Sequence, residues 1–395
     1  MKILVHDYGG YPFIYELSRS LAGRGLKIIH IYSSSSGSPS SDFYESDYLT
    51  VIDLGKSLEK VKKDSLISRF WQERSYGKRI EKKIRELDPD IVISANTPLE
   101  AQKRVAAICF RKHIYFVHWL QDILSIAAEN VIRKRNFFLS RIVGEYFRNI
   151  ERKCLLSADY VITISVDFSS IIQKWGISTE KISIIENWAN IADISLCNKS
   201  NVFSRENRIE NTFNIVYSGT LGMKQDPELL VKVASTYRAN PQIRIVVVAT
   251  GSGVVYLKER VKTEGLTNIL ILPLQPFKAI SEVLGSGDLL LAMLEPDASV
   301  YCVPSKVLTY YCAGKPSLLI LSKENLAARL TIENKLGFVV EPGHFTQLRS
   351  VIDYALLNSE ELDMYGRRAR KYAEAHFGIE GITDKFLQII NMLRK

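Results

Sequence analysis

The most informative part of the chain is VPSKVLTYYCAGKP, residues 303–316. A proline turn leads into a short apolar helix, and Gly314, Lys315 and Pro316 end it, because glycine closes helices and proline cannot continue them. Ser305 is expected to cap this helix through its hydroxyl, and Lys306 adds a full positive charge to the partial charge of a helix N-terminus. The pattern predicts either an ordinary capped helix of an α/β domain or a helix start that binds an anion.

Around this stretch, strand-like and helix-like segments alternate along a chain of 395 residues, which predicts parallel sheets flanked by helices. We expect an α/β fold of two doubly wound Rossmann-like domains facing each other across a cleft. The first domain is expected over residues 1–192 and the second over 213–376, with a polar linker at 193–212 between them. A C-terminal helix within 377–395 is expected to close the chain and could pack back on the first domain.

Composition narrows the class of protein. Five cysteines are widely spaced and no Cys-x-x-Cys occurs, so neither a disulfide framework nor a zinc site is indicated, and we expect no metal. The N-terminal MKILVHD is typical of a first strand rather than a signal peptide, and there is no run of 18 apolar residues. These features predict a cytoplasmic protein.

The net charge of +9 is concentrated in two segments. Residues 56–85 hold eleven Lys/Arg against four Asp/Glu, and residues 133–153 hold seven against two, interleaved with apolar side chains such as Phe137 and Phe138. A basic amphipathic helix is a candidate for an anionic membrane surface, and the alternative is a solvated face packed on its own domain. No nucleic-acid recognition motif is present, so nucleic acid is not an expected partner.

In the first domain, glycine and polar residues follow two expected strands, where parallel α/β sheets bind ligands. Gly9 and Gly10 could let the backbone approach a ligand closely, although tight βα turns also use a glycine pair structurally. The Gly-x-Gly-x-x-Gly fingerprint is absent, which speaks against a dinucleotide dehydrogenase. His118 and Asp122 come at the end of a strand expected at 113–118, as a candidate acid or base or as a satisfied histidine and a helix-capping aspartate.

In the second domain, three small-residue loops open toward helices, an arrangement suited to backbone N–H contacts with phosphate oxygens. The residues that we predict to bind a phosphorylated donor are Gly219, Thr220, Lys224, Gly251, Gly253, Pro304, Ser305, Lys306 and Thr309.

The ordered set of motifs resembles the retaining, metal-independent glycosyltransferases of family 4, which have two Rossmann-like domains (GT-B), over essentially the whole chain. No single motif is specific. The set comprises the Gly9-Gly10 loop, SADYVITIS at 157–165, ENWAN at 186–190, YSGTLG at 217–222, GSG at 251–253 and the PSK helix at 304–306. The Asn-Trp-Ala and Pro-Ser-Lys variants are most similar to the bacterial branch that adds amino and deoxy sugars in O-antigen or capsule assembly.

Two departures from the family pattern affect the donor site. The family commonly carries two glutamates eight positions apart, where this chain has Tyr301 and Thr309. Thr220 stands where the family often has an arginine on the diphosphate, and Gln225, or with a one-residue shift Lys224, stands in place of its lysine. Lys306 and backbone N–H groups are therefore expected to carry more of the phosphate binding. Ser299 and Tyr301 are expected to meet the donor sugar.

The resemblance implies a cofactor-independent enzyme that moves an N-acetylated amino sugar or a deoxy sugar, with retention, from a nucleoside diphosphate such as UDP. The implied acceptor is a polyprenyl-linked saccharide of bacterial surface polysaccharide (lipopolysaccharide or capsule) synthesis, at the inner face of the plasma membrane. Asp122 or His118 would orient the acceptor hydroxyl or assist its deprotonation. Two alternatives are a sugar-nucleotide epimerase of the same architecture and a non-catalytic nucleotide-sugar binding protein, which the missing glutamates make plausible.

Overall fold

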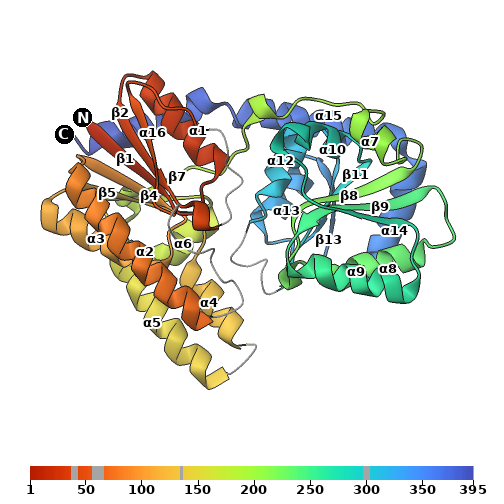
Figure 1. Cartoon of the computed structure of the whole chain (residues 1–395), viewed down its shortest axis with the longest axis horizontal. Coiled ribbons are helices and arrows are strands. Elements are labelled where there is room, and N and C mark those ends of the chain that lie inside the picture. The colour runs from red at the N-terminus through yellow and green to blue at the C-terminus, as the bar shows by residue number, and fades with distance from the viewer. Residues whose placement is uncertain (37–42, 56–65, 134–136, 297–302, 395) are drawn as a thin grey trace. The chain divides into compact units, whose positions relative to one another are not determined.

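The computed structural model describes residues 1–36, 43–55, 66–133, 137–296 and 303–394. Contacts divide the chain into two compact units. Unit 1 comprises Met1–Asn187 and Ile379–Lys395, and unit 2 comprises Trp188–Gly378. Each unit is a parallel sheet flanked by helices (Figure 1), as the sequence predicted.

Unit 1 contains a seven-stranded sheet in the order β3-β2-β1-β4-β5-β6-β7, which runs outward from β1 in both directions as in doubly wound Rossmann-like sheets. Its strands are almost continuously apolar because helices cover both faces, and Ile3, Leu4 and Val5 have no exposed surface. The strands are β1 (Lys2–Asp7), β2 (Lys27–Tyr32), β3 (Leu49–Asp53), β4 (Ile91–Ala95), β5 (Tyr115–Leu120), β6 (Tyr160–Thr163) and β7 (Ile182–Ile184). The helices are α1 (Pro12–Gly23), α2 (Leu66–Leu87), α3 (Leu99–Lys112), α4 (Leu124–Arg133), α5 (Phe137–Leu156), α6 (Val166–Lys174) and α16 (Ile379–Met392).

Unit 2 contains a six-stranded parallel sheet in the order β10-β9-β8-β11-β12-β13, again with the first strand of the unit near the centre. One buried cluster includes residues of β8 and β9 and of the helices that cover them. The strands are β8 (Phe213–Thr220), β9 (Ile243–Thr250), β10 (Ile269–Leu272), β11 (Leu289–Met293), β12 (Ser317–Ile320) and β13 (Gly337–Val340). The helices are α7 (Val202–Glu206), α8 (Pro227–Thr236), α9 (Ser252–Glu264), α10 (Ile280–Gly285), α12 (Lys306–Cys312), α13 (Leu326–Glu333), α14 (Phe345–Leu357) and α15 (Ser359–His376).

The last helix, α16, packs on unit 1. Thr383 Oγ1 donates a hydrogen bond to Ser20 Oγ on α1 at 2.7 Å, and Phe386 packs edge-on against Trp119 of β5 with ring centroids 4.9 Å apart. The stretch 193–212, which the sequence suggested as a linker, contains α7 and lies within unit 2. There Asn201 caps α7 and also donates to the carbonyl of Glu282 at 2.9 Å.

One strand boundary differs from the prediction in a way that matters for the site. We expected a strand at 113–118, but α3 continues to Lys112 and His113 takes a left-handed conformation with φ of 55°. The strand therefore starts at Tyr115 and runs to Leu120. His118 consequently lies inside β5 rather than after it.

Candidate functional site

Lys306 is the cation around which the candidate donor subsite of unit 2 is built. It is the first residue of α12, and its ammonium nitrogen lies 3.5 Å from the centre of the buried Tyr217 ring on β8. Gly219 lies close by, because a Cβ atom built there would be 3.4 Å from Lys306 Nζ. Within the described part of the chain, Nζ is buried and has no hydrogen-bond partner. The site thus presents a buried lysine side chain whose ammonium lies over an aromatic ring.

Burial, with a smaller contribution from the charge of Lys224, lowers the pKa of Lys306 to about 7. Lys224 is exposed in the short 3-10 turn that follows β8. Two cations at one strand end repel each other, and a bound anion would relieve that repulsion and favour the charged form of Lys306. The electrostatics therefore favour a ligand with negative charge at the carboxyl end of β8.

The glycine loop after β9 packs closely against the loop after β8. The N–H of Gly253 donates to the carbonyl of Leu221 at 2.9 Å, and the N–H of Leu221 donates to the carbonyl of Thr250 at 2.7 Å. A Cβ atom at Gly251 would come within 2.5 Å of the Leu221 carbonyl oxygen, at a φ of +119°. The N–H of Gly253 therefore joins the β9–α9 turn to the loop after β8, and the binding of a donor by Gly251 and Gly253 stays a prediction.

The cap predicted for Ser305 is also absent. Ser305 is exposed and already has helical dihedrals of φ −56° and ψ −26°, and its side chain makes no cap hydrogen bond. A capping serine needs extended backbone to turn its hydroxyl back to the first-turn N–H groups. Pro304 instead accepts a hydrogen bond from Val307 N at 3.1 Å through its carbonyl. Thr309 lies one turn beyond Lys306 and is half-buried, whereas Ser299 and Tyr301 lie outside the described residues.

In unit 1, the glycine turn after β1 closes around a buried carboxylate that sequence reasoning missed. Asp7 accepts hydrogen bonds from the N–H of Gly9 at 3.0 Å and from the N–H of Tyr11, and burial raises its pKa to about 7. Gly10 has a φ of 64°, which a glycine adopts without strain. The N–H of Gly9 therefore faces Asp7, and the binding of a donor by Gly9 and Gly10 stays a prediction.

His118 is buried inside β5, with Ser94 of β4 beside it and His6 of β1 beyond Ser94 in the same register. Burial lowers the pKa of His118 to about 4, so its imidazole is neutral at pH 7, and Nδ1 has no hydrogen-bond partner among the described residues. His6 in turn contacts Ser94 Oγ at 3.0 Å and the Tyr76 hydroxyl at 2.8 Å. The position predicted for His118, at the strand end, is thus corrected to the sheet interior.

Beyond β5, the polar residues are arranged around the start of α4. Gln121 Oε1 accepts from Asn187 Nδ2 at 2.6 Å. Asp122, half-buried, follows directly. The first N–H groups of α4, those of Leu124 and Ser125, donate at 2.9 and 3.1 Å to the buried carboxylate of Glu151 on α5. Glu151 was not predicted, since a glutamate in a basic amphipathic helix is typical of a surface position.

Glu151 also accepts from Ser125 Oγ at 2.5 Å. Burial, with a contribution from the negative charge of Asp122, raises the pKa of Glu151 to about 7. Two carboxyl groups therefore lie at the carboxyl end of β5, a buried one that holds the start of α4 and a more accessible one at Asp122.

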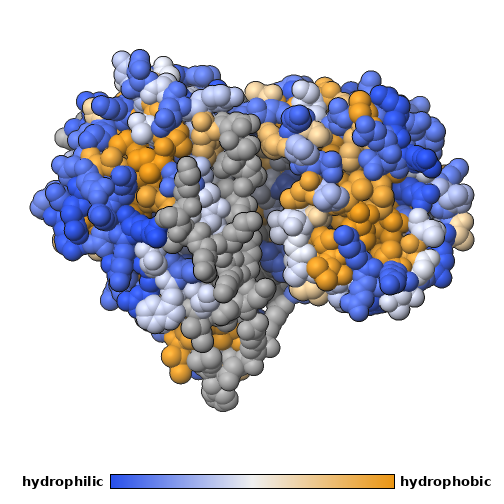
Figure 2. Space-filling view, viewed as in Figure 1, coloured by the Kyte–Doolittle hydropathy of each residue, from blue (hydrophilic) through white to orange (hydrophobic). Residues whose placement is uncertain are grey.

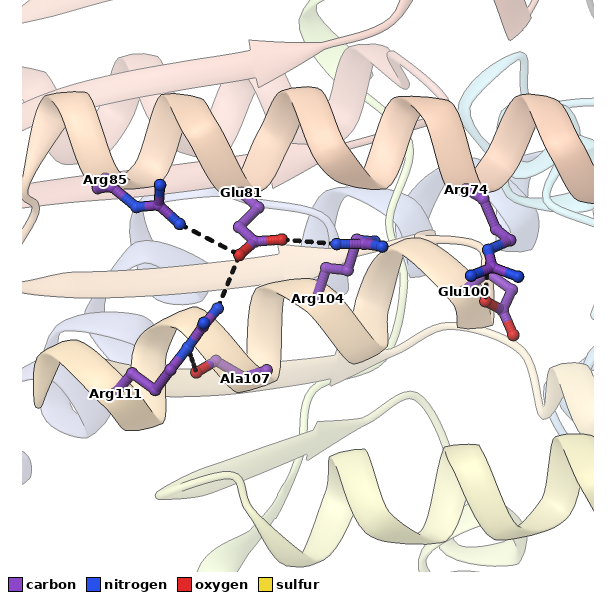
Figure 3. A network of polar contacts seen from close by, with 7 residues as sticks. All are labelled: Arg74, Glu81, Arg85, Glu100, Arg104, Ala107 and Arg111. Atoms are coloured by element: carbon purple, nitrogen blue, oxygen red, sulfur yellow. Dashed lines mark hydrogen bonds and ion pairs between the residues drawn. The ribbon is translucent and has the colours of Figure 1, made fainter.

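Some of the cations of the basic segment in α2 form ion pairs within unit 1, and a glutamate of the same helix pairs with arginines of α3. Glu81 accepts from Arg104 at 2.8 Å, from Arg111 at 2.7 Å and from Arg85 at 3.3 Å, and Arg74 lies 3.7 Å from Glu100 (Figure 3). These ion pairs connect α2 to α3. The described part of this segment fits the solvated, self-packed alternative better than a membrane surface.

Helix α5 keeps apolar side chains on its surface. Phe137 is 64% exposed and Ile142 is 70% exposed, and Arg141 between them has no ion-pair partner among the described residues. Figure 2 shows hydrophobic surface near the end of α4 and the beginning of α5 in this view. Lys134 and Arg135 lie outside the described residues, as do residues 56–65 of the other basic segment.

Metal ligands and membrane spans were searched over the described ranges. No group of three or more His, Cys, Asp or Glu that could hold a metal ion occurs there. The metal prediction overlooked one Asp-x-Asp, Asp88-Pro89-Asp90, but it precedes β4 at the amino edge of the sheet, where Asp90 accepts from the backbone N–H of Lys2 at 2.6 Å. Among these residues no helix is both long and apolar enough to cross a bilayer.

Two family models match the chain. Glycosyltransferase Family 4 matches residues 9–193, and Glycosyl transferases group 1 matches residues 198–372. Among curated proteins, the chain is similar to the putative colanic acid biosynthesis glycosyl transferase WcaI of Escherichia coli (strain K12), with 28% identity over 253 residues. That match covers 63% of this chain and 61% of the relative.

Solved structures with the same fold cover nearly the whole chain. Anabaena Alr3699/HepE in complex with UDP has a TM-score of 0.69 at 16% identity, covering 99% of this chain and 100% of that one. WaaG, a glycosyltransferase involved in lipopolysaccharide biosynthesis, has a TM-score of 0.71 at 16% identity, covering 98% and 99%. Sucrose-phosphate synthase from Thermosynechococcus elongatus has a TM-score of 0.78 at 13% identity, covering 100% and 99%. The predicted fold of two Rossmann-like domains, GT-B, is confirmed.

Proposed function

We propose that this chain, each half of which matches a glycosyltransferase family model, transfers a sugar from UDP to a lipid-linked saccharide. The observation that carries the proposal is the buried ammonium of Lys306, which has no hydrogen-bond partner among the described residues. UDP as the donor is supported by the structural relative HepE, whose structures contain UDP and UDP-glucose. Bacterial surface polysaccharide as the product is supported by WcaI and WaaG, whose names place them in colanic acid and lipopolysaccharide biosynthesis.

On the donor side, Lys306 and Lys224 bind the diphosphate. Negative charge grows on the departing diphosphate as the glycosidic bond breaks, and a preorganised ammonium stabilises that charge without reorganising. The Tyr217 ring holds the ammonium of Lys306 in place before the ligand arrives. Thr309, one turn further along α12, takes the place at which relatives use a glutamate. In this proposal the reaction retains the anomeric configuration and needs no metal.

On the acceptor side, Asp122 orients the acceptor hydroxyl or takes its proton. Asp122 follows β5 and is half-buried, whereas His118 lies inside the strand with its pKa lowered to about 4. A base must reach the proton that it removes, so accessibility favours Asp122 over His118. Glu151 fixes the start of α4 immediately after Asp122 and so acts as a positioning residue.

The lipid-linked acceptor would bring unit 1 to the inner face of the plasma membrane. The exposed Phe137 and Ile142, with the unpaired Arg141 between them, offer shallow apolar insertion and attraction to anionic headgroups. The proposal therefore includes peripheral attachment through the beginning of α5 rather than through α2, whose described cations are mostly paired.

A panel of UDP-sugars with and without a polyprenyl-diphosphate-linked acceptor tests the function, with products identified by mass spectrometry. We expect acceptor-dependent transfer of an N-acetylated amino sugar or a deoxy sugar. Epimerised nucleotide sugar without acceptor would establish an epimerase, and binding without turnover across the panel would establish a binding protein. Either result would refute the transferase proposal.

A further inference from the structure

A second groove, of about 810 Å³, opens in unit 2 at the amino ends of β8, β11 and β12. Phe213 begins β8, Asp288 precedes β11 and Pro316 precedes β12. The carboxyl ends of these strands lie on the opposite side of the sheet along the strand direction, and α12 starts there with Lys306. The groove is therefore a separate place from the candidate donor subsite, and nothing proposed above uses it.

Three cations line this groove: Lys315, Arg367 and Lys371. Their side chains have no hydrogen-bond or ion-pair partner among the described residues. Most other charged groups of the groove are already paired. Asp288 binds Lys199 at 2.7 Å, and Arg370 binds Glu374 at 2.8 Å.

Asp363 is the one further acid that lines the groove, and it is exposed. Counted over the part of the chain that the structure describes, the groove therefore has three cationic side chains without an ion-pair partner against one such carboxylate, Asp363. Such an excess attracts a ligand that carries more than one negative charge.

Lys315 is the most informative of the three. It follows Gly314, whose φ of +63° ends α12, and its side chain is half-buried between Asp288 and the start of α15. Burial lowers the pKa of Lys315, with Asp288 acting weakly in the opposite direction. A partly buried ammonium without a partner destabilises the unliganded fold, and such a group is typical of a binding site.

We propose that this groove binds a phosphate-bearing small molecule. Lys315, Arg367 and Lys371 bind the phosphate oxygens, which accept several charge-assisted hydrogen bonds at once. The apolar walls, Leu196 and Phe213 among them, contact the uncharged part of the ligand. The groove is a second anion site of unit 2, in addition to the one at Lys306.

Calorimetry with inorganic pyrophosphate tests this inference. Arg367→Ala with Lys371→Ala should weaken one class of pyrophosphate binding at least tenfold, because both residues are exposed and their loss should spare the fold. The matched control, Lys323→Ala with Arg368→Ala, removes the same charge from unit 2 outside the groove and should change affinity less than twofold. Equal losses in the two double variants would mean that only net charge matters and would overturn the proposal.

Two further variants separate the groove from the donor subsite and from a structural role. Pyrophosphate binding at the groove should survive Lys306→Ala, and its complete loss there would overturn the proposal. Lys315→Met should abolish groove binding without lowering the melting temperature, because it removes a partly buried ammonium that has no partner. A lower melting temperature with unchanged pyrophosphate binding would show that Lys315 only supports the fold.

Discussion

Lys306→Met tests the donor subsite most directly, because methionine keeps an apolar stem over Tyr217 and removes only the ammonium. A hydrogen bond to a charged group contributes about 1.5–3 kcal/mol, so UDP affinity should fall roughly 10- to 150-fold. Lys224→Met is the matched control: Lys224 is exposed, so its charge is screened by solvent and its loss should weaken UDP binding less. Isothermal calorimetry with UDP measures both. Unchanged UDP affinity in a folded Lys306→Met protein would refute the assignment.

The same variant has an effect on stability that the control should lack. Burial lowers the pKa of Lys306 from its usual 10.5 to about 7, and each pKa unit corresponds to about 1.4 kcal/mol, so the charged lysine destabilises the unliganded fold by on the order of 5 kcal/mol. Attraction to the Tyr217 ring offsets up to about 2 kcal/mol of this. The unfolded chain keeps its proton up to about pH 10.5, so the destabilisation is full below pH 7 and decreases as pH rises.

Lys306→Met should therefore melt a few degrees above the parent at pH 6, and the difference should shrink at pH 9. UDP affinity of the parent should also fall as pH rises above 7, because the unliganded lysine must first take up a proton. Thermal melts and calorimetry at pH 6 and pH 9 measure both trends. A variant that melts below the parent at pH 6 would mean that the ammonium stabilises the unliganded fold, against this reasoning.

Four further outcomes are expected. Asp122→Asn should leave UDP affinity intact and lower turnover by roughly 100-fold or more, as for loss of a general base; full activity in a steady-state assay would remove Asp122 from the mechanism. Glu151 has its pKa raised to about 7, so its contribution to stability is present below about pH 4.5 and lost as pH rises through 7, and Glu151→Gln should abolish that part of the pH dependence in denaturant titrations. Phe137→Ser with Ile142→Ser should reduce co-sedimentation with anionic vesicles and activity on a lipid acceptor but not on a soluble analogue, while Val255→Ser, an equally exposed site of unit 2 (70%), should change neither; loss on both acceptors would contradict membrane attachment. Transfer should persist in excess EDTA, and a loss restored by Mn²⁺ or Mg²⁺ would reject the metal-independent mechanism.

The fold class could be predicted from the sequence, because the patterns that specify strands and helices are local and recur along the chain. Apolar strands such as Ile3–Val5 within β1, each followed by a turn and a helix, specify parallel sheets wherever they occur. Boundaries were less predictable. The predicted start of β5 was wrong by two residues, because α3 continues to Lys112 and His113 closes it in a left-handed conformation. The residue type alone does not predict that conformation for a histidine.

The candidate site was predicted less well, because its arrangement depends on contacts between residues far apart in the chain. The sequence predicted that Lys306 lies at a helix start, but it did not predict the contact of Lys306 with Tyr217, which is 89 residues earlier in the chain. The glycine motifs were recognised in the sequence, but the partners of their N–H groups were not: the N–H of Gly253 donates to Leu221, and that of Gly9 donates to Asp7. Glu151 was missed because its partners on α4 precede it by 26 and 27 residues.

The return of α16 to unit 1 has a consequence for biosynthesis. All residues of unit 2 are available for folding once Gly378 has left the ribosome, whereas unit 1, although begun first, lacks its last helix until Met392 has left it as well. N-terminal domains generally fold first during synthesis. Here the core of unit 1 is completed after that of unit 2, although unit 1 is begun first. Until then the surface that Phe386 and Ile390 will cover is open to chaperones or aggregation, and a stop codon after residue 378 would damage the unit that was made first.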